Sequence, residues 1–170
     1  MLETERLIIR PLTYPQLVKY IKADGSLELE LNLNNTTRTI SSELKEALEE
    51  TILPNVSDKS KDYLYNTIWT LISKSANKMV GDLCIVGEPN EFGEIEIGYG
   101  TYEEFRGNGF MTEAVCGLIN WASSQPKVTS IVASTEKNNI ASFTILQKNK
   151  FVKIGESEEL FNWKLIIKEL

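Results

Sequence analysis

The sequence predicts an α+β fold, with a single domain over residues 1–170 and a mixed, mostly antiparallel sheet flanked by helices. Two observations predict this fold. Three segments in the middle of the chain alternate with the two-residue period of strands and are joined by short links, as in an antiparallel meander. The segment that follows carries apolar residues at helical spacing on one broad face, and such a face needs a sheet to cover it.

The first third of the chain is predicted to be one strand followed by helices. The strand covers 6–12, and a helix covers 13–23 with Thr13 as its N-cap. A second helix covers 41–53, with apolar residues on one face and acids on the other. We expect it to end before Pro54, because proline lacks the N–H that continues a helix. Residues 54–66 are polar and turn-rich, which predicts a loop.

The remaining elements follow in a regular order. The meander consists of strands over 67–73, 79–86 and 93–101. A long helix begins at Phe110 and is closed by Pro126, and a largely buried strand follows over 127–135. A short helix over 138–148 and strands over 151–155 and 159–168 complete the chain. We find no internal repeat, so the whole chain is assigned to one domain.

Composition excludes several classes of function. The formal net charge of −6 and the scattered lysines argue against a nucleic-acid partner, which needs clustered cations. The two cysteines, Cys84 and Cys116, and the absence of histidine leave no zinc-ligand pattern, so no metal is expected. The N-terminal segment lacks the apolar core of a signal peptide, and no apolar run suits a membrane span. We expect a cytoplasmic protein without a membrane partner.

The segment "FRGNGFMTEA", residues 105–114, places two glycines between a predicted strand and a predicted helix. A helix start presents N–H groups without partners and a partial positive charge, which together attract phosphate. Glycine at positions 107 and 109 lets the backbone approach such a group closely. The spacing is neither that of a P-loop nor that of the dinucleotide fingerprint. An ordinary turn is the alternative interpretation.

The longer segment "IEIGYGTYEEFRGNGFMTEA" resembles the acetyl-CoA-binding segment of the GNAT acyltransferase superfamily, whose loop reads Gln/Arg-x-x-Gly-x-Gly/Ala. Arg106 and Gly109 match this loop, whereas Met111 replaces its small final residue. The opening "ETERLIIRPL" and the later "NNIASFTILQKNKF" are similar to the branch with ribosomal-protein N-terminal acetyltransferases and small-amine acetyltransferases. The resemblance implies acetyl-CoA as cosubstrate and a small-molecule or peptide N-terminal amine as acceptor.

The resemblance also implies a set of cofactor-binding residues. Pantetheine is expected beside the end of the third meander strand, at Tyr99, Gly100 and Thr101. Asn139 and Ser142 match a motif that contacts pantetheine and the thiol, although a helix cap followed by an ordinary serine is the alternative. The pyrophosphate is expected at one continuous segment: Arg106, Gly107, Asn108, Gly109, Phe110, Met111 and Thr112.

One position departs from the family pattern. The family usually has glycine before the phenylalanine that here is Phe151, and this chain has Lys150 instead. We expect Asn149 to take the left-handed turn in its place.

The predicted chemistry rests on two carboxylates and one hydroxyl. Strand alternation puts Glu94 and Glu96 on the same face, where like charge favours proton uptake by one of them. Glu96 is the preferred base, through water, and Glu94 is the second candidate; a solvated strand face is the alternative. Ser142 is the expected proton donor to the thiolate, because Leu146 stands where many superfamily members have tyrosine.

Acetyl transfer is expected to occur by direct attack in a ternary complex. The alternative function is a non-catalytic acyl-CoA-binding regulatory domain of the same fold. Two tyrosines of the polar loop, Tyr63 and Tyr65, are candidates to reach the acceptor pocket. The sequence gives no indication of the oligomeric state.

Overall fold

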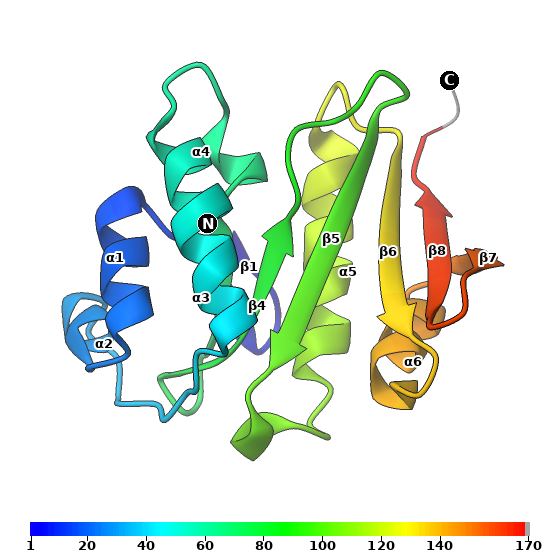
Figure 1. The fold of residues 1–170 in the computed structure, drawn as a ribbon. Coiled ribbons are helices and arrows are strands. Elements are labelled where there is room, and N and C mark those ends of the chain that lie inside the picture. The colour runs from blue at the N-terminus through cyan, green and yellow to red at the C-terminus, as the bar shows by residue number, and fades with distance from the viewer. Residues whose placement is uncertain (169–170) are drawn as a thin grey trace.

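The structure, a computed structural model, describes residues 1–168. Its eight strands form one sheet in the order β1-β2-β3-β4-β5-β6-β8-β7, in which β5 and β6 are parallel and all other neighbours antiparallel (Figure 1). The predicted fold class is thereby confirmed. The strands are β1 Leu2–Glu3, β2 Leu7–Pro11, β3 Ile68–Ser73, β4 Lys78–Ile85, β5 Glu94–Thr101, β6 Ser130–Glu136, β7 Val152–Glu156 and β8 Leu160–Ile166.

Helices cover both faces of this sheet. Helix α5 lies behind the sheet in Figure 1, where it connects β5 to β6, whereas α1 to α4 lie in front of its first strands. The helices are α1 Tyr14–Lys22, α2 Ser26–Glu30, α3 Ser42–Ala47, α4 Leu53–Ser57, α5 Phe110–Ser124 and α6 Ile140–Lys148, with a π-helical turn η1 at Leu48–Ile52 and 3-10 turns η2 at Tyr63–Tyr65 and η3 at Glu103–Phe105.

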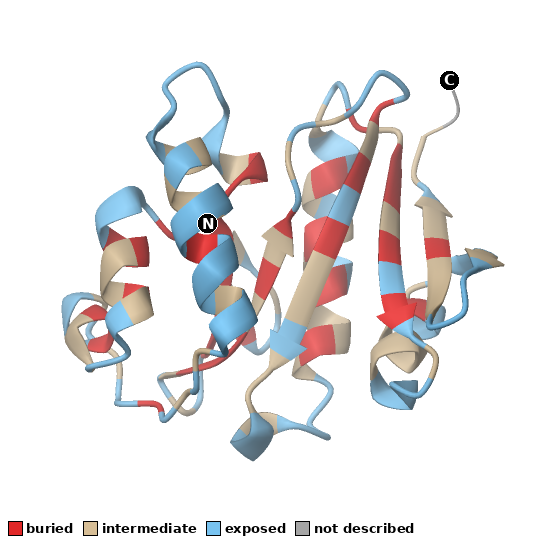
Figure 2. Cartoon of the chain, in the orientation of Figure 1, coloured by how far each residue is buried: buried red, intermediate tan, exposed pale blue. Residues whose placement is uncertain are grey.

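Strand alternation divides the apolar side chains between two cores. On β5, Ile95 and Ile97 are buried toward α5, and Glu96 between them is exposed. Figure 2 shows the corresponding change between buried and exposed bands along this strand. The core under α5 includes Leu118 of its apolar stripe, as the helical spacing predicted. The second core, on the opposite face, joins Leu17 of α1 and Leu48 to the first strands. Each face of the sheet is therefore covered by its own helices.

The sheet opens between its two parallel strands. β5 pairs with β6 only from Glu94 to Glu96, opposite Ser130 to Val132. Beyond Glu96, β5 continues to Thr101 paired with β4 alone, and β6 continues paired with β8 alone. The second half of β5 therefore has a free backbone edge that faces the gap.

The second predicted helix does not end before Pro54, and this prediction was wrong. Helical backbone runs from α3 through the π-helical turn η1 into α4, and Pro54 lies in the first turn of α4. A proline inside a helix removes one hydrogen bond and pushes against the carbonyl one turn earlier. The wider π-turn directly before it gives that carbonyl more room, so the chain continues as a helix.

The end of α6 also differs from the prediction. Lys150 itself takes the left-handed conformation, with φ of 67°, whereas Asn149 has φ of −91°. The Asn149 side chain instead donates hydrogen bonds to the carbonyl oxygens of Thr112 and Ile145, at 3.1 Å and 3.0 Å. Asn149 thus ties the end of α6 to the first turn of α5, and this leaves the left-handed turn to Lys150.

Other predicted elements agree with the structure to within a few residues. Thr13 caps α1, and its N–H donates to the side chain of Gln16 at 3.0 Å. The short β1 and α2 carry no periodic pattern and were not predicted. No helix in the described range 1–168 is long and apolar enough to cross a membrane.

Candidate active site

The glycine loop has the backbone geometry that its sequence predicted. Gly107 and Gly109 both have a backbone φ of 76°, which residues with a side chain rarely adopt. Gly109 is the N-cap of α5. No atom lies within 4 Å of the position that a Cβ on Gly107 would take. The first N–H groups of α5 have no carbonyl partner inside the helix. The loop and the helix start therefore form an open cradle for an anion.

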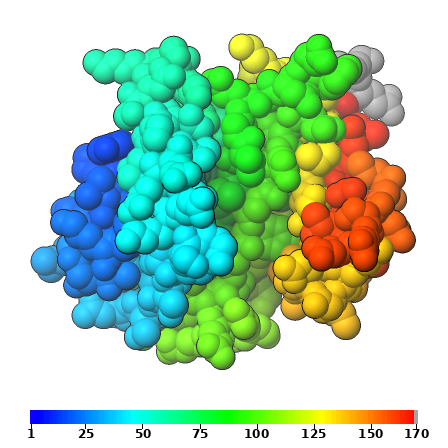
Figure 3. Space-filling view, in the orientation of Figure 1, coloured from blue at the N-terminus to red at the C-terminus, as the bar shows by residue number. Residues whose placement is uncertain are grey.

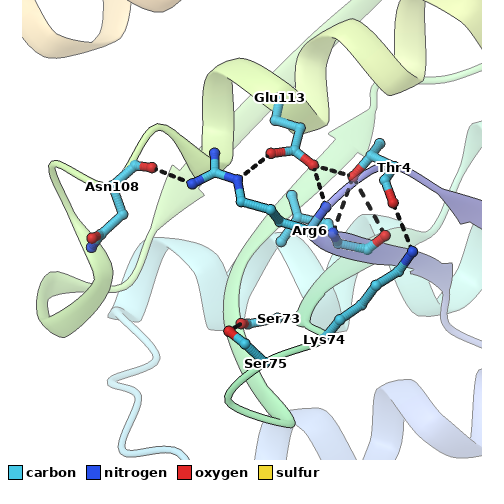
Figure 4. A network of polar contacts seen from close by, with 8 residues as sticks. Thr4, Arg6, Ser73, Lys74, Ser75, Asn108 and Glu113 are labelled. Carbon is cyan, nitrogen blue, oxygen red and sulfur yellow. Dashed lines mark hydrogen bonds and ion pairs between the residues drawn. The ribbon is translucent and has the colours of Figure 1, made fainter.

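A polar network holds this loop against the start of the chain (Figure 4). Arg6 donates to the carbonyl oxygen of Asn108 at 2.8 Å and pairs with the Glu113 carboxylate at 2.7 Å. The other Glu113 oxygen accepts from Thr4 and from the Arg6 N–H. The Arg6 guanidinium also lies 4.9 Å from the centre of the Phe110 ring. Arg6 therefore fixes the position of the loop by holding the Asn108 carbonyl.

A cavity of about 540 Å³ begins at the cradle and follows the gap between β5 and α6; we call it the cofactor cavity. Every predicted cofactor-binding residue except Asn108 lines it. The lining residues are Tyr99, Gly100, Thr101, Phe105, Arg106, Gly107, Gly109, Phe110, Met111, Thr112, Asn139, Ala141, Ser142, Thr144, Ile145 and Lys148.

The free edge of β5 forms one wall of the cofactor cavity. On the β4 side, the Glu96 carbonyl accepts from the Val86 N–H, and the Tyr102 N–H donates to the Val80 carbonyl. Strand hydrogen bonding alternates, so the N–H and C=O groups of Tyr99 and Thr101 point away from β4, toward the gap. The Arg106 side chain approaches the Thr101 carbonyl at 3.3 Å. An extended ligand in the gap can therefore pair with β5 as an added strand does.

Ser142 lies on the other wall, next to the hydroxyl of Tyr99. Asn139 caps α6 and accepts a hydrogen bond from the Ser142 N–H at 3.1 Å. The Tyr99 hydroxyl donates to the Ser142 carbonyl at 2.8 Å and accepts from the Ser142 hydroxyl at 3.3 Å. Burial raises the pKa of the Tyr99 hydroxyl, and the hydrogen bond from Ser142 lowers it by a smaller amount. Two hydroxyls thus meet in the cofactor cavity, where only Ser142 was predicted to contribute one.

A second cavity, of about 340 Å³, lies on the opposite face of β5 and is called here the acceptor cavity. In Figure 3 the surface of β5 is uncovered between the helices at left and the C-terminal strands at right. Tyr99, Gly100 and Thr101 line both cavities. The remaining lining residues are Tyr20, Thr39, Leu44, Ile52, Ile68, Asp82, Leu83, Cys84, Gly98 and Tyr102. The two cavities thus share the end of β5 as a common wall.

The acceptor cavity holds one carboxylate, that of Asp82. Its Oδ2 accepts hydrogen bonds from the hydroxyls of Tyr20 and Tyr102, each at 2.7 Å. Burial raises the pKa of the Asp82 carboxyl, and the hydrogen bonds from the two tyrosines oppose this shift. Burial, together with the charge of Asp82, also raises the pKa of both tyrosine hydroxyls. The sequence analysis missed all three residues.

The two predicted carboxylates of β5 lie in different surroundings. Glu96 is exposed, on the same strand face as Gly98, which lines the acceptor cavity. Glu94, at the start of the strand, forms an ion pair of 2.7 Å with Lys164 of β8. Neither carboxylate lines the acceptor cavity directly, but Glu96 lies two residues from its wall.

The tyrosines expected at the acceptor pocket lie elsewhere. Tyr65 is buried, with its ring 5.4 Å from that of Trp121, and Tyr63 lines a separate hollow near α1 and α4. A further residue that the sequence analysis missed is Lys148, which lines the cofactor cavity. Helical spacing was the available signal, because Ala141, Ile145 and Lys148 share one face of α6.

Comparisons with known proteins agree with this geometry. A family model described as an acetyltransferase (GNAT) domain matches residues 6–152. The uncharacterized N-acetyltransferase YjdG of Bacillus subtilis (strain 168) is 32% identical over 171 residues, which cover 99% of each protein. The structure of the ribosomal-protein-S5-alanine acetyltransferase from Vibrio fischeri is similar with a TM-score of 0.71, at 20% identity, over 98% of this chain and 96% of that one. The ribosomal L7/L12 alpha-N-protein acetyltransferase RimL, in complex with coenzyme A, gives 0.67 at 16% identity, over 96% and 95%.

An anion cradle at a helix start, continued by a free strand edge, suits an acyltransferase whose acyl donor is a CoA thioester. The sequence match over nearly the whole chain makes the assignment specific: this chain belongs to the GNAT acetyltransferase family. It is an N-acetyltransferase that uses acetyl-CoA, as the sequence predicted, and the comparisons give the non-catalytic alternative no support.

Proposed function

We propose that residues 1–170 form a single domain that transfers the acetyl group of acetyl-CoA to a primary amine by direct attack in a ternary complex. The observation that carries the proposal is the wall that the two cavities share at the end of β5, where three consecutive residues line both. A thioester on one side and an amine on the other meet there across Gly100, which has no side chain. The chain needs no covalent intermediate to join them.

The cysteines support direct attack. Burial raises the pKa of the Cys84 thiol to about 11, so this thiol is a poor nucleophile at neutral pH. Cys116 is exposed on α5 and lines neither the cofactor nor the acceptor cavity. Both cysteines are unpaired, which suits the reducing cytoplasm in which we propose that the enzyme acts.

The residues of the cofactor cavity fit a CoA thioester. The cradle is open at Gly107, where a pyrophosphate needs to approach, the Arg6 guanidinium lies beside Gly109, and Lys148 adds a cation to the same cavity. The free edge of β5 offers the N–H and C=O of Tyr99 and Thr101 to the amides of pantetheine. When bound, acetyl-CoA supplies an activated acyl carbon and a thiolate leaving group.

Two side chains are assigned to proton transfer. Glu96 takes the proton of the incoming ammonium group through water, because its exposed carboxylate lies two residues from the wall of the acceptor cavity. We prefer it to Glu94, whose carboxylate is bound to Lys164. Ser142 donates its hydroxyl proton to the departing thiolate when its hydrogen bond to the Tyr99 hydroxyl is exchanged for one to the sulfur, and Ser142 regains a proton from solvent.

The proposed acceptor is a small-molecule amine or the N-terminal amine of a peptide. The two solved neighbours described above are named as acetyltransferases of ribosomal proteins, which supports a peptide N-terminus. The acceptor cavity of about 340 Å³ is at the small end of the range for ligand sites. It therefore admits the amine and a few neighbouring atoms of the acceptor.

A panel of amines tests the proposal. Acetyl-CoA turnover is measured with peptide N-termini, alkylamines, polyamines, aminoglycosides and amino acids, and the acetylated product is identified by mass spectrometry. We expect transfer to at least one class. Binding of CoA without transfer to any member would contradict the proposal and restore the regulatory alternative.

The Ser142→Ala enzyme tests the proton donor. We expect a lower kcat with CoA affinity within several-fold of the wild type, because a proton donor acts mainly in the transition state. Ser123→Ala is the matched control, since Ser123 is also a helical serine but lines neither cavity. Equal kcat values for the two variants would remove Ser142 from the mechanism.

The Glu96→Gln enzyme tests the base. We expect turnover to fall by about 10²-fold, in line with general-base contributions, and to recover partly at high pH, where the amine loses its proton without help. A wild-type rate and pH profile in this variant would show that Glu96 is only part of a solvated strand face.

A further inference from the structure

The acceptor cavity combines apolar walls with a single charged group. Leu44, Ile52, Ile68 and Leu83 contribute apolar surface, and Asp82 is the one charged side chain among its lining residues in the described part of the chain. A carboxylate in such surroundings is costly unless donors or a cation compensate it. The groups that offset the cost of the Asp82 charge therefore determine what the cavity can bind.

The compensation inside the protein is incomplete. The hydroxyls of Tyr20 and Tyr102 both donate to Oδ2. Oδ1 is closed to solvent and has no hydrogen-bond partner of good geometry among residues 1–168, although the buried hydroxyl of Thr70, which pairs with Asp82 across β3 and β4, lowers the pKa of the carboxyl. A carboxylate offers about four acceptor positions, so capacity for further donors remains. The network stabilises a charge at Asp82 without neutralising it.

The nearest cation of the chain is already engaged elsewhere. Arg38, from the segment between α2 and α3, is buried in an ion pair with Glu28 and donates to the Tyr20 carbonyl. Its guanidinium also stacks over the Tyr20 ring, 4.8 Å from the ring centre. No ion pair joins Arg38 to Asp82 in the described residues, so Arg38 acts on Asp82 only beyond ion-pair distance, where its charge lowers the pKa of the carboxyl.

Asp82 lies directly beside the wall that the two cavities share. It pairs with Gly100 across β4 and β5, and directly paired residues of antiparallel strands point to the same face with their Cβ positions about 5 Å apart. No atom lies within 4 Å of the position that a Cβ on Gly100 would take. The space over Gly100, on the same sheet face as Asp82, is therefore open, and it adjoins the place where the acyl group is proposed to be transferred.

We propose that Asp82 binds the ammonium group of the acceptor, and that the acceptors of this enzyme are amines with one positive charge on a small, otherwise neutral body. This inference rests on the proposed function, because it names the substrate class of the same site. One carboxylate matches one ammonium group, and the apolar walls match neutral atoms around it. A carboxylate next to the amine, as in a free amino acid, faces Asp82 and is repelled, whereas an amide or peptide bond at that place is not.

Binding to the CoA-saturated protein tests this inference separately from catalysis. The probes are alaninamide, lactamide, which replaces the amine with a hydroxyl, and free alanine, each titrated calorimetrically into wild type and Asp82→Asn. We expect wild type to bind alaninamide at least about tenfold more tightly than the other two probes, as an engaged buried charge implies. Asp82→Asn keeps the shape and both tyrosine partners, and we expect it to lose this preference for alaninamide.

Controls separate the outcomes. Glu91→Gln makes the same change in net charge on the exposed link between β4 and β5, outside both cavities, and it is expected to bind all probes as the wild type does. Equal affinity of wild type for alaninamide and lactamide, or an unchanged preference in Asp82→Asn, would overturn the inference whether or not the variant is stable. Acetyl transfer by the wild type is followed in parallel. If the wild type transfers no acetyl group to alaninamide but binds it in an Asp82-dependent way, the proposed function is rejected and the amine-binding site is supported.

Discussion

Replacing Gly100 with valine distinguishes what acetyl transfer needs at this position from what folding stability needs there. Gly100 lies in β5, has no unusual backbone angle, and has no atom within 4 Å of an added Cβ. Its missing side chain faces the acceptor cavity beside Asp82. A valine there adds methyl groups at the point where amine and thioester are proposed to meet. The fold has no need of glycine at this position, whereas the proposed reaction does.

The magnitudes follow from this placement. Glycine in a strand costs roughly 0.5–1 kcal/mol relative to alanine, and β-branched residues favour strands. We expect Gly100→Val to leave the melting temperature unchanged or raise it by a few degrees, at about 2–4 °C per kcal/mol for a chain of this size. Displacement of a reacting group by about 1 Å costs on the order of 10²-fold in rate, so kcat/KM is expected to fall by at least about that factor.

The matched control is Gly155→Val. Gly155 also lies in a strand, has ordinary backbone angles and has no atom within 4 Å of an added Cβ, but it lines neither the cofactor nor the acceptor cavity. The assay is acetyl transfer to the best amine of the panel, with melting temperatures measured alongside. Equal activities of the two variants would refute the placement of the reaction at Gly100, and a large loss of stability confined to Gly100→Val would refute the open space beside it.

The other predictions concern stability. Lys150→Gly is expected to raise the melting temperature by about 1–4 °C, because Lys150 holds a left-handed conformation that costs other residues roughly 1 kcal/mol more than glycine; an unchanged value would show no strain there. Asp82→Asn is expected to be more stable than wild type at neutral pH and not in acid. Burial raises the Asp82 pKa above its ordinary 3.8. The contribution of Asp82 to folding stability is therefore fully present below pH 3.8 and is lost as the pH rises through the folded-state pKa. Tyr20 and Tyr102, which face Asp82, keep their protons over this range because burial raises the pKa of both hydroxyls, and the charge of Arg38 also acts on Asp82. A pH-independent difference between the melting temperatures of variant and wild type would contradict the assignment.

That the residues proposed to bind the cofactor lie together could be predicted, because their signals are local. A strand, two glycines and an apolar helix follow one another between residues 94 and 124, and neighbouring backbone forms the cradle. The N-cap Asn139 and the following Ser142 are likewise contained in one helical turn. Chain order alone places such features beside each other, so their motif carries over directly to the structure.

The acceptor side was not predictable because its residues come together only through the tertiary fold. Asp82 has the pattern of an ordinary polar residue on a strand, and its partner Tyr20 has that of an apolar helix position, 62 residues away. Nothing in the local sequence indicates that the buried Arg38 pairs with Glu28. Tyr63 and Tyr65 stood out because they occur in a polar loop, yet Tyr65 packs against the long helix α5.

The central claim is that the acetyl group passes directly from acetyl-CoA to an amine across the end of β5. Rapid mixing of the enzyme with acetyl-CoA and its best amine, followed by quenching and intact-mass spectrometry of protein and product, tests it most directly. We predict one acetylated amine for each CoA released, with no acetylated protein at any time. A protein species that gains one acetyl group and then loses it to the amine would contradict direct attack, and release of CoA without acetylated amine would contradict the transferase assignment itself.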